Sequence, residues 1–125
     1  MKPLAELKVL VIEDEMLGRM LLEDLLQELG CTVIGPVASI AAGVELAGGA
    51  DVDVALLDIN IDGVRVYPVA DALAQRGIPF AFVTGYKIGA ARGYYDDRPA
   101  VQKPVRKADL EAVLIAAMEH GGTRW

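Results

Sequence analysis

The stretch that decides the fold is Val52-Asp53-Val54-Ala55-Leu56-Leu57-Asp58-Ile59-Asn60, an apolar run that ends in a carboxylate. Strands that are buried on both faces have this pattern, and such strands are typical of parallel sheets. In open α/β sheets, ligands bind in the crevice outside the carboxyl ends of the strands. Asp58 stands at that end of its strand, so we expect its carboxylate to face a binding site.

The composition indicates one domain over residues 1–125, with a sizeable core, because 54% of the residues are hydrophobic. The net charge of −6 argues against a nucleic-acid surface, which needs clustered Lys and Arg, and the length leaves no room for an attached output domain. Cys31 is the only cysteine and Met1–Lys8 lacks the apolar core of a signal peptide, so a cytoplasmic location is expected. No apolar run approaches the ~20 residues that cross a membrane.

Apolar runs alternate with amphipathic segments, which predicts strand–helix units joined by short connections. That order is typical of an α/β fold with a five-stranded parallel sheet and helices on both faces. Pro36 places the second strand at a sheet edge, because proline has no N–H to donate. The expected strands are Leu7–Ile12, Thr32–Val37, Val52–Asn60, Ile78–Thr84 and Ala100–Gln102.

Helices are expected between these strands and after the last one. The first carries leucines at helical spacing, with Met16 and Met20 as core residues. The fourth, within Lys87–Arg98, should be short or irregular because two glycines interrupt it and a proline follows. The first helix is expected to end at Gly30, and the remaining helices begin or end at Ser39, Gly48–Gly49, Pro68, Gly77 and Gly121–Gly122.

Three carboxylates, those of Glu13, Asp14 and Asp58, should meet where two neighbouring strands end. Carboxylates placed this close repel one another, and a divalent cation relieves the repulsion. Mg²⁺ suits such a site, since it takes hard oxygen ligands, uses few protein carboxylates and keeps several waters. The alternative for Glu13 and Asp14 is that they only solvate a turn or favour a helix N-terminus.

Asp58 is ionised at neutral pH and can attack phosphorus without an adjacent base, as carboxylates do in aspartyl-phosphate chemistry. Lys103 can supply a positive charge to the transferring oxygens, and Thr84 a hydroxyl donor. Gly85 leaves room for a phosphoryl group, and Pro104 permits a cis bond that aims Lys103 inward. Three of these residues also have a plain alternative: Lys103 as a surface lysine, Thr84 as a strand-favouring residue and Gly85 as a turn residue.

Together these residues resemble the receiver domain of bacterial two-component response regulators. The resemblance covers Leu7–Met118, and its motifs are Glu13-Asp14, Asp58, Thr84-Gly85 and Lys103-Pro104, each at an expected strand end. It implies a flavodoxin-like fold with strand order 2-1-3-4-5. It also implies a Mg²⁺ site formed by the side chains of Asp14 and Asp58 and the backbone carbonyl of Asn60, with Glu13 acting through water. No enzyme activity is implied beyond self-catalysed phosphorylation and dephosphorylation.

A finer resemblance lies in Pro79-Phe80-Ala81-Phe82-Val83-Thr84-Gly85-Tyr86. It is similar to the motif of the "FAT GUY" single-domain receivers of alphaproteobacterial general stress signalling, whose usual run is Phe-Ala-Thr-Gly-Tyr. Here Val83 replaces the alanine. The resemblance implies that the chain exchanges phosphoryl groups with sensor histidine kinases or competes for those groups. It also implies signalling through a phosphotransfer protein or downstream regulator, with no nucleic-acid or membrane partner.

The conformational switch is assigned to Tyr86, with Gly85 and Pro104 beside it. Most receivers carry an aromatic residue three positions before the lysine, and here that position is Ala100. Tyr86 follows Thr84 by two residues, so its large side chain can overhang the pocket and shield an acyl phosphate. The alternative is that Tyr86 only covers apolar surface.

Two other functions fit part of the pattern. A Mg²⁺-dependent phosphatase of the haloacid dehalogenase type also uses an aspartate nucleophile, but its signature needs a second aspartate where Asn60 stands. A phosphorylation-independent receiver scaffold would usually have lost part of the acidic pair, the aspartate, the threonine or the lysine. All of these are present here.

Overall fold

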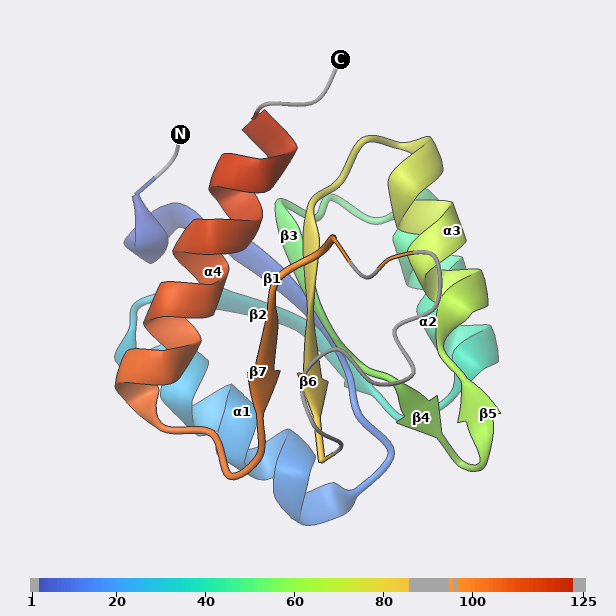
Figure 1. Ribbon diagram of the computed structural model, residues 1–125, viewed down its shortest axis with the longest axis horizontal. Coiled ribbons are helices and arrows are strands. Elements are labelled where there is room, and N and C mark those ends of the chain that lie inside the picture. The colour runs from blue at the N-terminus through green and yellow to red at the C-terminus, as the bar shows by residue number, and fades with distance from the viewer. Residues whose placement is uncertain (1–2, 86–94, 96, 123–125) are drawn as a thin grey trace.

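The central feature is a five-stranded parallel sheet in the order β2-β1-β3-β6-β7 (Figure 1). The structure is a computed structural model that describes residues 3–85, 95 and 97–122. In chain order the strands of this sheet are β1 (Lys8–Ile12), β2 (Thr32–Val37), β3 (Val54–Asp58), β6 (Phe80–Thr84) and β7 (Ala100–Gln102). These are the first to fifth expected strands, so the expected order 2-1-3-4-5 is confirmed.

The stretch that predicted the fold lies at the centre of this sheet. All residues of β3 are buried, because β1 and β6 flank the strand and helices cover both of its faces. β2 is at the edge as Pro36 indicated, and all six of its residues are exposed or half-buried. A continuous apolar run therefore marks a strand that is flanked by other strands at both edges and covered by helices on both faces.

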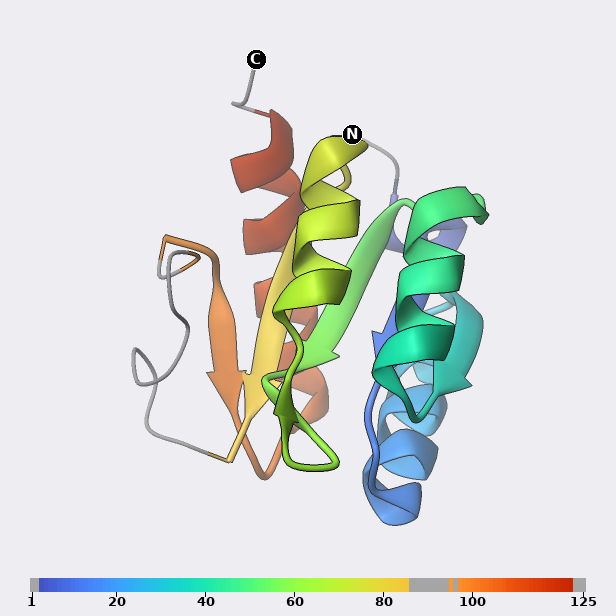
Figure 2. The same ribbon diagram turned by 90° about the vertical axis from the view of Figure 1, so that its right-hand side faces the viewer.

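Helices cover the sheet on both faces. The helices are α1 (Met16–Glu28), α2 (Ile40–Gly49), α3 (Tyr67–Gln75) and α4 (Lys107–Gly122), preceded by a short 3-10 turn at Leu4–Glu6. Figure 1 shows α4 on one side of the strands and α2 and α3 on the other, and in Figure 2 α2 and α3 lie in front of the strands. Successive strand residues point to opposite faces. Val9 and Val11 therefore pack with the leucines of α1 and α4, while Leu10 and Ile12 pack with α2 and α3. The prediction of an irregular fourth helix within Lys87–Arg98 falls largely outside the described residues.

A short hairpin lies between β3 and α3, where the sequence predicted no strand beyond Asn60. Its strands are β4 (Asn60–Ile61) and β5 (Val64–Arg65), paired antiparallel. The two residues between them, Asp62 and Gly63, have φ of 51° and 81°. An Asp-Gly pair with both φ positive is the preferred two-residue hairpin turn. The sequence thus contained the hairpin signal directly after β3.

The first half of α1 differs from expectation. Met16 and Met20, expected in the core, are 64% and 53% exposed. Leu17 and Leu21 are also exposed, at 76% and 43%. The core contacts of α1 come from leucines nearer its C-terminal end, so the first turns leave their apolar side chains in solvent. These four residues, Met16, Leu17, Met20 and Leu21, are called the α1 patch below. Among the described residues, no helix is long and apolar enough to cross a membrane.

Candidate functional site

The register of the parallel strands brings the predicted residues to one edge of the sheet. Ile12 pairs with Leu57, so the next residues along, Glu13 and Asp58, lie side by side. Asp58 in turn pairs with Val83, directly before Thr84. Thr84 pairs with Gln102, which puts Lys103 at the same edge. Four strand ends therefore converge by main-chain pairing alone.

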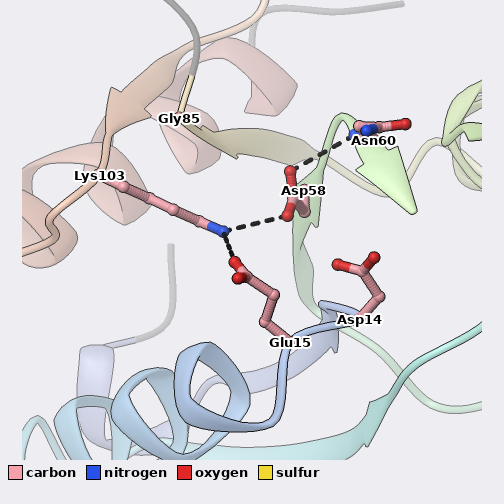
Figure 3. A pocket seen from close by; sticks show the side chains of 6 residues that line it. All are labelled: Asp14, Glu15, Asp58, Asn60, Gly85 and Lys103. Carbon is pink, nitrogen blue, oxygen red and sulfur yellow. Dashed lines mark hydrogen bonds and ion pairs between the residues drawn. The ribbon is translucent and has the colours of Figure 1, made fainter. Parts of the chain in front are cut away.

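An open pocket of about 360 Å³ lies at this edge, as Figure 3 shows from close by. Asp58 lies on its floor and is 8% exposed. The pocket is lined by Asp14, Glu15, Asp58, Asn60, Gly85 and Lys103. Five of these six were singled out from the sequence for the site, and Glu15 was not. Thr84, which precedes the lining residue Gly85, is buried at 1% exposure.

The acidic cluster predicted from the sequence is present. Glu13, Asp14 and Asp58 each offer a carboxylate oxygen, and these oxygens lie within 4.8 Å of one another. Oxygen ligands at this spacing fit a hard divalent cation such as Mg²⁺, which would also relieve their repulsion. Glu13 is fully buried, Asp14 is half-buried, and both follow β1 directly.

Lys103 provides the positive charge that faces this cluster. Its Nζ lies 3.1 Å from Oδ2 of Asp58 and 2.6 Å from Oε1 of Glu13. The peptide bond between Lys103 and Pro104 is cis, as the sequence allowed. The backbone N–H of Lys103 donates to the carbonyl of Thr84 at 2.8 Å, which ties the start of this turn to β6.

The pKa values of Glu13 and Lys103 are both raised, for different reasons. Burial raises the pKa of Glu13 to about 7, although the hydrogen bond from Lys103 acts in the opposite direction. For Lys103, burial on its own would lower the pKa, but hydrogen bonds to Glu13 and Asp58 outweigh it and raise the pKa. Lys103 therefore stays charged at neutral pH, and the ammonium is the group that offsets the buried carboxylates.

Backbone amides hold the two aspartates that face the pocket. The N–H of Asn60 donates to Oδ1 of Asp58 at 3.4 Å, and the N–H of Asp62 donates to Oδ2 of Asp14 at 2.8 Å. The β4–β5 hairpin thus contacts the acidic cluster directly. Gly85 is exposed at the rim of the pocket, and Tyr86, the predicted switch, lies outside the described residues.

Sequence reasoning missed two residues of α1 that shape the acidic turn. Nη1 of Arg19 donates to the carbonyls of Glu13 and Asp14, at 3.1 and 2.9 Å. The signal was a basic residue one helical turn beyond Glu15, close enough to reach back to the turn. Gly18 packs against Glu13, since a Cβ at Gly18 would lie 2.8 Å from Oε1 of Glu13.

Comparisons with known proteins agree with this geometry. A family model described as the response regulator receiver domain matches residues 9–115. The solution structure of SdrG from Sphingomonas melonis Fr1 is 37% identical, covers 91% of this chain and 98% of that chain, and has a TM-score of 0.81. The BeF3-activated conformation of SdrG from Pseudomonas melonis Fr1 is also 37% identical, with coverages of 94% and 99% and a TM-score of 0.78.

A more distant relative is the anti-anti-sigma factor PhyR from Bartonella quintana. It is 26% identical with a TM-score of 0.76, and the match covers 94% of this chain but 49% of that one. Among curated proteins, none matches the chain.

Replacing Gly18 tests the packing of α1 on Glu13. The control is Gly48→Ala in α2, where an added Cβ meets nothing within 4 Å. Alanine forms helices better than glycine, so this variant should raise the free energy of unfolding by up to about 1 kcal/mol. Gly18→Ala should lower it by about 1–3 kcal/mol, because the new Cβ overlaps a buried carboxylate. Urea denaturation of both variants measures the difference. An equal gain in both variants would show that Glu13 is not held against α1.

Metal binding to the acidic cluster can be measured as stabilisation. Mg²⁺ at about tenfold its dissociation constant should stabilise the chain by about 1.4 kcal/mol, or roughly 3–6 °C. Asp14→Ala should reduce this shift, whereas Asp24→Ala, an exposed position on α1, should keep it. Thermal denaturation at constant ionic strength is the measurement. An undiminished shift in Asp14→Ala, or none in the wild type, contradicts the assignment.

Proposed function

This chain belongs to the response regulator receiver domain family. We propose that it is a single-domain response regulator that accepts a phosphoryl group on Asp58 from a sensor histidine kinase. The observation that carries the proposal is the contact of 3.1 Å between Oδ2 of Asp58 and Nζ of Lys103 at the floor of an open pocket. It pairs an ionised nucleophile with a cation that can then bind the transferred group.

The transfer exchanges one bond to phosphorus for another. An oxygen of Asp58 attacks the phosphorus of a phosphohistidine and the O–P bond forms as the P–N bond breaks. The electron pair of the broken bond stays on the imidazole nitrogen. Lys103 donates to an oxygen of the transferred group, and the hydroxyl of Thr84 donates to another. Hydrolysis by water later restores the Asp58 carboxylate and releases phosphate.

The acidic cluster would hold Mg²⁺ through the side chains of Asp14 and Asp58 and the backbone carbonyl of Asn60, with Glu13 acting through water. When bound, Mg²⁺ supplies positive charge that offsets both the carboxylates and the phosphoryl oxygens. Glu13 also serves Lys103. Its fully buried carboxylate at 2.6 Å keeps the ammonium directed into the site. Tyr86, with Gly85 and Pro104, is proposed as the switch that responds to phosphorylation.

The partners are proposed to be proteins throughout. The match with SdrG covers 98% of that chain, which supports a receiver without a further domain, and the resemblance of Pro79–Tyr86 to the "FAT GUY" motif suggests stress signalling. The chain would pass its phosphoryl group to a phosphotransfer protein or act on a downstream regulator. The α1 patch begins at Met16, directly after Glu15 at the pocket rim. An exposed apolar surface beside the nucleophile favours a donor that is itself a protein, because such surfaces mark interaction sites.

The phosphoryl acceptor can be identified by substitution. The wild type should take up label from a radioactive acyl phosphate with Mg²⁺, and Asp58→Asn should lose that label because an amide is not a nucleophile. Asp62→Asn makes the same isosteric change beside the site, at a backbone φ of 51° that Asn tolerates, and should retain it. The label should be released by alkali. Label that persists in Asp58→Asn would contradict the proposal.

The role of the α1 patch can be tested with two kinds of donor. Leu17→Asn should slow transfer from a phosphorylated histidine kinase by about tenfold or more, as expected for a buried interface contact. Transfer from a small acyl phosphate should not change. Val44→Asn, at an exposed apolar position on α2, is the control and should leave both rates unchanged. Equal effects of Leu17→Asn on both donors would mean that the patch does not contact the kinase.

A further inference from the structure

Within the described part of the chain, Lys103 has three carboxylate neighbours, and they differ in how firmly they are held. Its Nζ lies 2.6 Å from Glu13, 3.1 Å from Asp58 and 3.5 Å from Glu15. The side chains of these residues are 0%, 10% and 73% exposed, respectively. A buried carboxylate loses much when it is separated from its cation, whereas an exposed one is re-solvated at little cost. Glu15 is therefore the partner that Lys103 can release most easily.

Phosphorylation of Asp58 would require Lys103 to release one of these carboxylates. An ammonium group has three N–H donors, and here three carboxylates face it. A phosphoryl group on Asp58 adds acceptor oxygens within the same pocket, and Lys103 must turn one donor toward them. Of the three partners, Glu15 has the longest contact and the most exposed side chain. A phosphoryl oxygen would therefore replace Glu15.

The side chain of Glu15 does not cap the helix that begins beside it. Glu15 is the N-cap residue of α1, yet its side chain accepts no capping hydrogen bond. Its backbone N–H donates to Oε2 of Glu13 at 3.1 Å, which fixes the main chain at the pocket rim. From there the side chain extends across the pocket toward Lys103 rather than along its own helix (Figure 3).

We propose that Glu15 is a positioning residue that occupies, in the unphosphorylated protein, the place of a phosphoryl oxygen on Lys103, and thereby weakens the site for the phosphoryl group. This inference rests on the proposed function and adds the regulation of the same site. While Asp58 is unmodified, Glu15 keeps the ammonium over the pocket. Once the phosphoryl group arrives, Glu15 competes with it for Lys103 and adds a negative charge beside it. Both effects limit the phosphorylated state, and salt screens the second.

The test is the affinity for beryllium fluoride at saturating Mg²⁺, followed by amide chemical shifts in NMR titrations. Glu15→Gln keeps the shape of the side chain and removes its charge, so it should bind beryllium fluoride about two- to fivefold more tightly, the size of an exposed ion pair. Glu15→Asp should bind with an intermediate affinity, because its shorter side chain reaches Lys103 less well. The gain in Glu15→Gln should shrink as salt is raised toward 1 M.

The control is Glu45→Gln, which makes the same change of net charge at an exposed position on α2 and should bind like the wild type. Unchanged or weaker binding in Glu15→Gln would overturn the inference. So would a joint loss of Mg²⁺ affinity and beryllium fluoride affinity, which would make Glu15 a metal ligand instead. If the wild type binds no beryllium fluoride and takes no label on Asp58, the proposed function fails and the inference with it. If the wild type does both, the variants decide the inference alone.

Discussion

The structure of this site depends on the charge balance around Lys103. Parallel strands end at one edge of the sheet, and their register places Glu13 and Asp58 next to each other. Two buried carboxylates would repel strongly without a cation between them. The ammonium of Lys103 reaches both, at 2.6 and 3.1 Å. Among the described residues that line the pocket, Lys103 is the only basic one, so an anion that binds there would meet this ammonium.

The rest of the fold serves to hold these strand ends. β3 is buried along its whole length, and Asp58 is its last residue. The side chain of Arg19 donates to the carbonyls of Glu13 and Asp14, and the backbone N–H of Asp62 in the β4–β5 hairpin donates to the side chain of Asp14. Hydrogen bonds that involve main-chain groups thus hold Glu13 and Asp14, while the solvent-exposed Glu15 stands at the rim.

Much of the fold could be predicted from the sequence because its strongest signals are local. The apolar run of β3 and the edge proline of β2 gave the right environments, and Ser39 does cap α2, with Oγ accepting from the N–H of Ala42 at 3.2 Å. The predicted acidic cluster forms because strand ends meet in any parallel sheet. The strand order itself came from the family resemblance, since local periodicity does not encode which strands are neighbours.

What the sequence did not reveal depends on tertiary contacts. Met16 and Met20 have helical spacing suited to a core, but the sheet supports only the later turns of α1, so both are exposed. Glu15 follows Glu13 and Asp14 in the sequence, but only the position of Lys103 shows that Glu15 and Lys103 face each other. The Asp62-Gly63 hairpin is different, because its turn signal is local and stands in the sequence itself.

Asp58 and Lys103 are proposed to receive the phosphoryl group together. A crystal structure of the protein with Mg²⁺ and beryllium fluoride would locate the acceptor. We expect a beryllium adduct on a carboxylate oxygen of Asp58, with Nζ of Lys103 in hydrogen-bonding distance of a fluoride. An adduct on another carboxylate, or one on Asp58 that Lys103 does not contact, would contradict this proposal.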